Sequence, residues 1–173
     1  MRPILKSAFL LLLIILCSNV NAQQSRVDSA ITQLKKSNTV KGLDSLAFMS
    51  ALDLISIAQL AESQIRQIEK SAEQFKKGSD EDLCYYIKTR ILSSLSTTDK
   101  FKAIDYGHQN LKQLEVSATP QSKVLYRHFL TLLRVPYRTS SKLTEGFPFY
   151  TKQLNQFKLQ NDSAAITVCY FVL

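Results

Sequence analysis

The sequence predicts an all-α protein in which antiparallel helix pairs stack as an α-solenoid. Apolar residues follow the helical spacings of 3 and 4 over most of the chain, and one such pattern occurs three times. Signals for strands are scarce, because the chain has only 4 Gly and 4 Pro and contains neither Asn-Gly nor Asp-Gly. These observations favour stacked helices over a sheet.

The repeated pattern has six apolar or small positions in each copy. The copies cover residues 57–68, 103–114 and 146–157, so their starts are offset by 46 and then 43 residues. The spacings within a copy place these side chains on one helix face, which needs a neighbouring helix to cover it. We interpret the three copies as equivalent helices of a repeat, with matching positions at Ile65, Leu111 and Leu154.

The first 22 residues have the composition of a signal peptide. Arg2 and Lys6 form a basic front, residues 8–17 are apolar, and residues 20–22 supply the small side chains that a signal peptidase accepts. The apolar run is about half of the roughly 20 residues that a membrane-spanning helix requires. We therefore expect export to the periplasm or the extracytoplasmic face of a bacterial inner membrane, with an uncleaved anchor as the alternative.

The remaining residues, 23–173, have the length of one domain with its own core. They keep two cysteines, Cys84 and Cys169, which lie 85 residues apart, close to twice the shorter repeat offset. Matching positions two repeats apart lie well beyond the roughly 7 Å between Cα atoms that a disulfide permits. The spacing thus predicts two unpaired, buried cysteines.

The first part of the mature chain leaves one choice open. Residues 23–43 form a leading segment with a short helix over 26–36, and the helical repeat domain covers 44–173. An unbroken apolar series then continues to residue 77 without Gly or Pro, which favours a single helix of about 34 residues. The repeat instead favours a hairpin with its turn near residues 53–56.

The later helices have clearer start signals. Ser79 to Asp82 resembles a capping box for a helix through about residue 96, and Ser96-Thr97-Thr98-Asp99 caps the second copy, which runs to about residue 115. Thr119-Pro120 predicts the next helix start. Asn161-Asp162-Ser163 predicts the start of a last helix.

Proline and glycine residues should interrupt two of the later helices, and the chain ends within an apolar run. Pro136 should bend or end its helix, and Gly146 and Pro148 should disturb the first turns of the third copy, which Ser140-Ser141 caps. The chain stops inside the apolar run 166–173, and an uncapped repeat array would expose an apolar face there. We interpret the sequence as a fragment, incomplete at its C-terminal end.

The pattern resembles tetratricopeptide-type repeats. A small residue occurs early in the second helix of each pair, at Ala58, Ala103 and Gly146, with aromatic residues a few positions later in the last two copies. The copies span 43 to 46 residues instead of about 34, and the chain has no Trp, so the resemblance is to the type of repeat. Behind a signal peptide, such repeats are similar to the extracytoplasmic part of bacterial sensor histidine kinases or related regulators.

The resemblance implies a sensory region of a longer signal-transduction protein. A membrane helix and a kinase or other cytoplasmic module would then follow Leu173. Its implied role is protein–protein interaction with a protein or peptide ligand. The alternative is a free-standing periplasmic adaptor or scaffold protein.

Signatures of catalysis, metals and cofactors are absent from the sequence. It contains no Cys-x-x-Cys, His-Glu-x-x-His, Gly-x-Ser-x-Gly or glycine-rich phosphate loop. The two histidines are interpreted as a surface residue, His108, and a partly buried one, His128. We predict no catalytic residue, no metal site and no cofactor for this region, and keep a hydrolase-type enzyme using Cys84 as the third hypothesis.

One stripe of basic residues is the candidate binding site. Five side chains at spacings of 4, 4, 3 and 4 share one helix face: Lys123, Arg127, Thr131, Arg134 and Arg138. In repeats of this kind the first helix of each pair lines the concave surface, which would direct the cations into a groove near Tyr85. Arginine pairs well with carboxylates or a peptide C-terminus. The alternative is a solvated face that keeps the protein soluble.

The net charge of the chain is moderately positive. The full chain carries +8, and removal of Arg2 and Lys6 with the signal leaves +6, spread along the sequence apart from the stripe and two Lys-Lys pairs. Nucleic-acid binding would require aromatics interleaved with base-contacting arginines and a cytoplasmic address. We expect no nucleic-acid partner, and membrane association only through sequence beyond Leu173 or an uncleaved signal.

Overall fold

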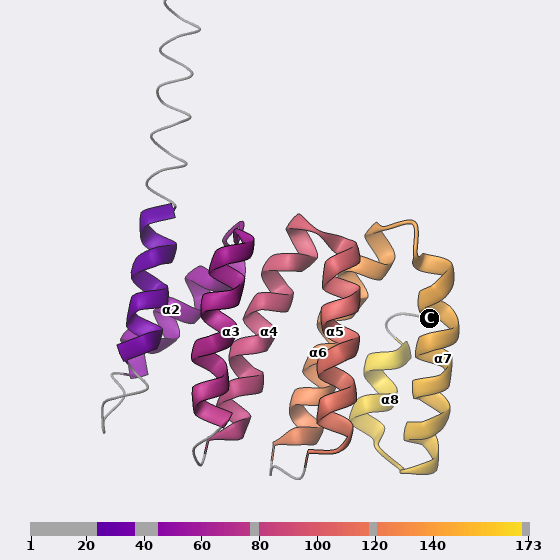
Figure 1. The fold of residues 1–173 in the computed structure, drawn as a ribbon. Helices are drawn as coiled ribbons and strands as arrows, with labels where there is room; N and C mark the ends of the chain where they lie inside the picture. Colours follow the sequence, from indigo (N-terminus) through magenta and orange to yellow (C-terminus); the bar gives the residue numbers. More distant parts are fainter. Residues whose placement is uncertain (1–23, 37–44, 77–79, 118–120, 171–173) are drawn as a thin grey trace, which may run out of the picture.

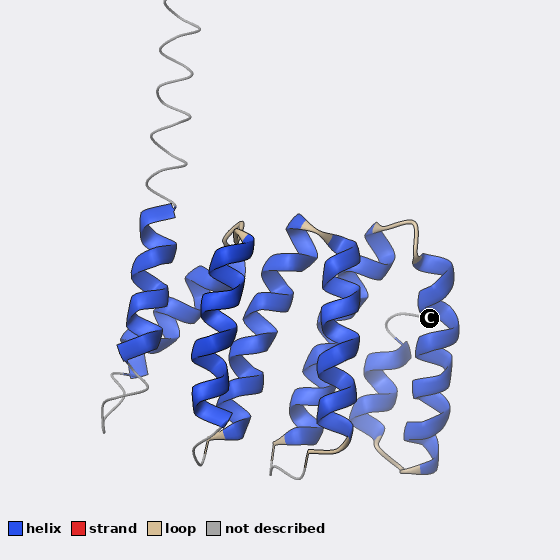
Figure 2. Ribbon diagram, viewed as in Figure 1, coloured by secondary structure: helices blue, strands red, loops and turns tan. Residues whose placement is uncertain are grey.

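The computed structural model describes residues 24–36, 45–76, 80–117 and 121–170, which form eight helices and no strand (Figure 2). The first helix covers residues 24–36 and confirms the expected leading helix. The other helices are α2 (Ser45–Ile57), α3 (Glu62–Lys76), α4 (Glu81–Thr98), α5 (Lys100–Glu115), α6 (Ser122–Thr139), α7 (Leu143–Leu159) and α8 (Ser163–Tyr170). The all-α prediction is therefore confirmed.

The helices pack in chain order along one direction (Figure 1). The even-numbered helices lie side by side, with α2 against α4, α4 against α6 and α6 against α8. The odd-numbered helices cover them: α3 packs on α4, α5 on α4 and α6, and α7 on α6 and α8. Each amphipathic face is thus covered mainly by helices close to it in sequence.

A continuous apolar core runs through the helices, and the second half of each pattern copy lies in it. Ile65, Leu111 and Leu154 are only 4, 3 and 6 % exposed. The residue just before each of them carries an amide side chain, and all three of these amides are buried as well: Gln64, Asn110 and Gln153. The three copies therefore share an environment at these positions.

The first half of the first copy does not match the others. Ile57 is 75 % exposed, whereas its counterparts Ala103 and Gly146 are buried. Residues 58–61 leave the helix and form a turn between α2 and α3, so the chain makes two helices there. The single-helix alternative is excluded, the turn lies a few residues after the position expected for the hairpin, and α2 and α3 each pack on α4.

Contacts made by side chains explain a turn that contains neither Gly nor Pro. The Ser94 hydroxyl of α4 donates to the Ala58 carbonyl at 2.6 Å. The backbone N–H of Ala61 donates to Gln64 Oε1 at 3.0 Å, as one half of a capping box. Two backbone groups at the break are thereby satisfied, one of them by a residue distant in sequence.

Two predicted helix starts are confirmed by their caps. The Asp99 carboxylate accepts from the Lys102 N–H at 3.0 Å at the start of α5, and the Asp162 carboxylate accepts from the Ala165 N–H at 3.0 Å at the start of α8. The N-cap of α4 is Asp80, whose side chain makes no capping hydrogen bond.

Pro136 does not end its helix, since α6 continues to Thr139, and α7 likewise continues through Pro148 to Leu159. Pro136 lies in the last turn of α6, where few backbone hydrogen bonds depend on it, and the Thr139 hydroxyl donates to the Val135 carbonyl there at 2.8 Å. Pro148 is the sixth residue of α7, so the hydrogen bond that an N–H there would donate to the Thr144 carbonyl is absent from the second turn.

Gly107 and Gly146 allow close helix packing. A Cβ at Gly107 would lie 2.5 Å from Leu133 Cδ2, so the glycine lets α5 approach α6. A Cβ at Gly146 would lie 3.0 Å from the Tyr137 ring, so the second glycine lets α7 approach α6. Gly146 thus stabilises the packing of the helix that it was expected to disturb.

The cysteine prediction is confirmed, since Cys84 and Cys169 are both buried and unpaired. Several other predictions fall on residues outside the described ranges: the signal peptide, Ser79, Thr119-Pro120 and residues 171–173. Within the described residues, every helix is too short or too polar to cross a lipid bilayer.

Candidate functional site

A cleft of about 310 Å³ lies where the end of α5 meets α6 and α7. Leu114 and Glu115 of α5 form one side, and Lys123, Tyr126 and Arg127 of α6 form another. Three residues of α7, its C-cap and the residue that precedes α8 form a further side: Gln153, Gln156, Phe157, Gln160 and Asp162. The cleft thus combines charged, amide and aromatic side chains.

The two cations of the cleft have few partners. Arg127 Nε donates to the carbonyl of Lys123, one turn earlier, at 3.1 Å. Arg127 Nη1 lies 3.7 Å from Asp162 Oδ1, which is longer than a hydrogen bond. The exposed Lys123 ammonium has no hydrogen bond or ion pair within the described part of the chain. Both side chains therefore retain N–H donors.

The two acids of the cleft are engaged within the protein. Asp162 Oδ1 caps α8 through the Ala165 N–H. Glu115 Oε1 lies 3.1 Å from the hydroxyl oxygen of Tyr126. Three of the four charged groups of the cleft thus have partners within the protein, and among the described residues only Lys123 has none.

Tyr126 is fixed by two neighbours. Its hydroxyl oxygen lies 3.1 Å from Glu115 Oε1 and 3.0 Å from Gln153 Oε1. A phenol has one proton, so we assign its donation to the carboxylate, with the Gln153 amide turned to present its NH₂ group. Burial, followed by the Glu115 charge, raises the pKa of Tyr126. The Tyr126 ring packs edge-on against Phe157 at 6.0 Å between centroids.

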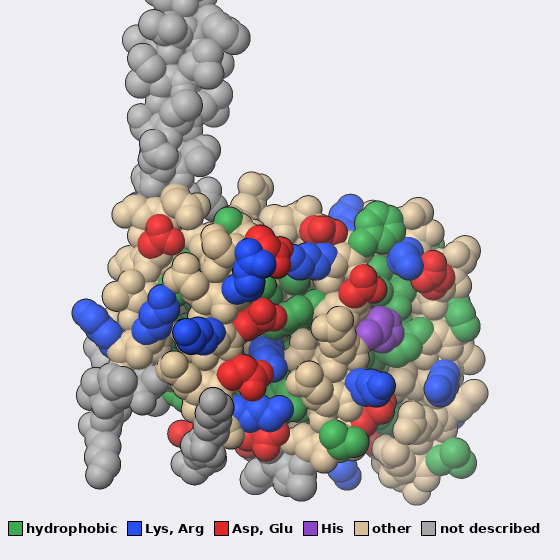
Figure 3. All heavy atoms as spheres, in the orientation of Figure 1, with side chains coloured by type: hydrophobic (Ala, Val, Ile, Leu, Met, Phe, Trp, Pro, Cys, Tyr) green, Lys and Arg blue, Asp and Glu red, His purple; other side chains and the backbone are tan. Residues whose placement is uncertain are grey.

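The predicted basic stripe is divided by the structure. Lys123 and Arg127 line the cleft, whereas Arg134 and Arg138 lie further along α6 and do not. Arg134 is half-buried and Arg138 is exposed. On the face seen in Figure 3, basic and acidic side chains are interspersed over most of the surface, and a group of basic side chains lies on the left.

Tyr85 does not join these cations. It is 1 % exposed, and the ammonium groups of Lys76 and Lys88 lie 5.6 and 5.5 Å from its ring centroid. The next residue, Tyr86, is half-buried under the Arg90 guanidinium, which lies 4.8 Å from its ring centroid. Successive residues of a helix point in directions about 100° apart. Apolar residues surround most of α4, so their spacing does not show which of the two tyrosines is buried.

The sequence reasoning missed the glutamines of α7. Gln153, Gln156 and Gln160 follow at spacings of 3 and 4, so they share one helix face, and all three line the cleft. That spacing was visible in the sequence. Their proximity to Lys123 and Arg127 depends on how α6 and α7 pack, which the spacing does not specify.

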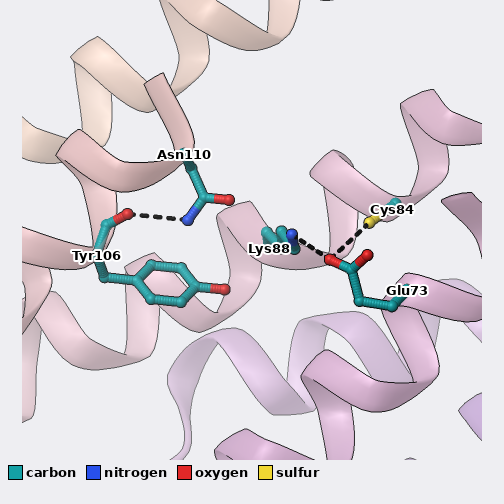
Figure 4. A network of polar contacts seen from close by, with 5 residues as sticks. All are labelled: Glu73, Cys84, Lys88, Tyr106 and Asn110. Atoms are coloured by element: carbon teal, nitrogen blue, oxygen red, sulfur yellow. Dashed lines mark hydrogen bonds and ion pairs between the residues drawn. The ribbon is translucent and has the colours of Figure 1, made fainter. Parts of the chain in front are cut away.

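A second polar cluster lies between α3, α4 and α5 (Figure 4). The Lys88 ammonium donates to Glu73 Oε1 at 2.6 Å, and the Cys84 sulfur lies 3.9 Å from the same oxygen. Burial raises the pKa of the Cys84 thiol to about 11. A thiol that stays protonated at neutral pH is a poor nucleophile, which favours a structural role for this cysteine.

The α5 side of this cluster holds two unsatisfied atoms. The side-chain oxygens of Tyr106 and Asn110 are buried and have no hydrogen-bond partner among the described residues. Asn110 uses its NH₂ group to donate to the Tyr106 carbonyl at 2.8 Å. Burial raises the pKa of Tyr106 well above its ordinary value.

His108, the expected surface residue, makes contacts within the protein. His108 is half-buried, its Nε2 lies 2.6 Å from the Tyr137 hydroxyl oxygen, and its ring packs edge-on against Phe149 at 4.5 Å. His128 is partly buried, as predicted. Burial lowers the pKa of both histidines.

Across the described ranges, no group of three or more His, Cys, Asp or Glu side chains is placed to hold a metal ion, and this includes both clusters. Comparison of the chain with protein-family models, curated proteins and solved structures gave no match.

Proposed function

We propose that the chain is a tetratricopeptide-like α-solenoid that binds a protein or peptide, as the extracytoplasmic sensory region of a longer signal-transduction protein. The observation that carries the proposal is the matched burial of Ile65, Leu111 and Leu154, each directly after a buried amide residue. Packing of the helices in chain order supports the same architecture. Such arrays contact mainly their neighbours and expose long surfaces suited to extended partners.

The basic residues of α6 give this surface its chemistry. Arg134 and Arg138 lie along the helix from the cleft that holds Lys123 and Arg127. Arginine and lysine at helical spacing would pair with acidic side chains of a partner and guide its approach. The net charge of +6 after removal of the signal is consistent with an acidic partner.

Site-specific photo-crosslinking in the producing bacterium tests this proposal. A photoreactive phenylalanine derivative replaces Arg134 or Arg138 in turn, and the exposed positions Lys70 of α3 and Lys112 of α5 serve as matched controls. We expect one discrete protein adduct at the two α6 positions and none at the controls. The proposal fails if the α6 positions give no adduct, or the same adducts as the controls.

A further inference from the structure

We propose that the cleft between α5, α6 and α7 is a binding site for a small organic carboxylate that also carries amide or hydroxyl groups. This goes beyond capture of a protein partner. The cleft volume of about 310 Å³ is at the lower end of small-molecule sites, which measure roughly 300 to 1,000 Å³. A compact solute fills such a space.

The available hydrogen-bonding groups determine the charge of the ligand. Asp162 and Glu115 already accept hydrogen bonds from protein groups, whereas Lys123 has no partner within the described residues and Arg127 Nη1 has only the 3.7 Å contact to Asp162. A ligand carboxylate would accept from these two side chains at ordinary charge-assisted distances of about 2.7 to 2.9 Å. The two carboxylates balance the two cations in formal charge, but N–H donors of Lys123 and Arg127 remain open to a ligand, so the cleft favours a group that accepts hydrogen bonds, as a carboxylate does.

The side of the cleft formed by α7 and its C-cap indicates which polar groups the ligand carries besides the carboxylate. The amides of Gln156 and Gln160 are exposed and make no side-chain hydrogen bond within the described residues. Each amide offers donors and an acceptor, so the two can bind hydroxyl or amide groups of either polarity. A simple inorganic anion would use the cations and leave these amides unused.

Apolar side chains close one part of the cleft. Leu114 and Phe157 are buried, and the Tyr126 ring packs edge-on against Phe157. They provide an apolar wall for the carbon skeleton of a ligand, while Lys123 and Arg127 supply the charged contact. A neutral polar solute would lose that charged contact, so an acid should bind more tightly.

Nuclear magnetic resonance titration of the purified chain tests the site with two acids, D-glucuronate for hydroxyl groups and N-acetylglutamate for amide groups. D-glucose and acetate serve as counterparts that lack the carboxylate or the polar body. We expect saturable shifts of the Gln156 and Gln160 side-chain NH₂ signals with at least one acid, at an affinity at least about tenfold above either counterpart. Which acid binds distinguishes a hydroxyl-bearing ligand from an amide-bearing one.

Two variants separate the cleft from the rest of α6. Arg127→Met should weaken binding by at least about tenfold, whereas Arg134→Met, on the same helix but outside the cleft, should leave it unchanged. The proposal is overturned if neither acid gives saturable shifts up to about 100 mM, if a counterpart binds equally well, or if both variants weaken binding alike. The crosslinks at Arg134 and Arg138 do not depend on this result, so either proposal can fail alone.

Discussion

The Lys88 ammonium lies 2.6 Å from Glu73 Oε1, although only 6 % of Lys88 is exposed. This pair joins α4 to α3, and the Tyr85 ring lies beside the same ammonium. Removing the partner of a buried charge destabilises a protein strongly, whereas replacing the buried charge itself by an apolar group is often neutral or stabilising. The two residues should therefore respond very differently to substitution.

Replacement of Glu73 by Ala leaves the Lys88 ammonium without its carboxylate. We expect the free energy of unfolding to fall by about 2 to 3 kcal/mol, less than the 3 to 5 kcal/mol of a fully buried pair, because half of the Glu73 side chain is exposed. Lys88→Met, which removes the charge and keeps an apolar chain, should be neutral or stabilising. Urea denaturation measures both, and equal losses would contradict the prediction.

Removal of the Tyr106 hydroxyl should not destabilise the protein. Its oxygen is buried without a partner, so Tyr106→Phe should leave stability unchanged or raise it by about 1 kcal/mol. The matched control is Tyr150→Phe. The Tyr150 hydroxyl donates to the Leu130 carbonyl at 2.7 Å, and its loss should cost about 1 to 2 kcal/mol in thermal or urea unfolding. A larger loss at Tyr106 than at Tyr150 would show that the Tyr106 hydroxyl has a stabilising partner.

Gly107→Ala should destabilise the α5–α6 contact. The new Cβ would lie 2.5 Å from Leu133 Cδ2, and such overpacking typically costs about 1 to 3 kcal/mol, more than the roughly 1 kcal/mol by which alanine favours a helix. The double variant with Leu133→Val tests the cause, since relief of the clash makes its loss smaller than the sum of the single losses. If the two stability losses are additive, the clash with Leu133 is not the cause of the destabilisation.

Acidification should destabilise the fold through His108. Burial lowers the pKa of this imidazole in the folded state, so between the folded and unfolded values the unfolded chain binds more protons. The stabilisation is present above the unfolded value of about 6.5 and is lost as the pH falls through the folded value.

The His108→Phe variant tests this linkage. The difference in urea midpoint between the parent chain and His108→Phe should shrink or reverse from pH 7.5 to pH 5, and other titrating groups largely cancel in that difference. His128→Phe should behave similarly, because burial also lowers the pKa of His128. A difference that does not vary with pH would exclude the linkage.

Processing of the N-terminus tests the expected export. When the chain with residues 1–22 is produced in a bacterium, the exported protein should begin at Gln23, as the intact mass will show. Replacement of Ala22 by a bulky residue should block the cleavage. A mass that retains residues 1–22 in the wild-type protein would support an uncleaved anchor instead.

The spacing of apolar residues predicted which segments are helices, because burial of one face is what stabilises each of them. Caps such as Asp99 and Asp162 are local, so they too were legible in the sequence. The turn at residues 58–61 was not, since one of its carbonyls is satisfied by Ser94 from α4. The other hydrogen bond of the turn runs from the Ala61 N–H to Gln64 Oε1. It is typical of a helix start, but a glutamine at that position does not by itself predict one.

The candidate site was predictable only along a single helix. Spacing placed Lys123 and Arg127 on one face of α6, as the cleft shows. Which glutamines of α7 face them depends on the packing of two helices, and Gly146 permits that packing by leaving room for Tyr137. Tyr85 was expected near the groove but is buried, because apolar residues surround so much of α4 that their spacing does not show which side faces the core.

One oxygen atom of Asp162 faces both Arg127 of α6 and the first turn of α8. The two contacts share a side chain with little freedom, so a shift of the guanidinium relative to α8 must stretch one of them. Part of the anchoring of the last described helix is thereby set at the rim of the cleft, by a single carboxylate on the short link that joins α7 to α8.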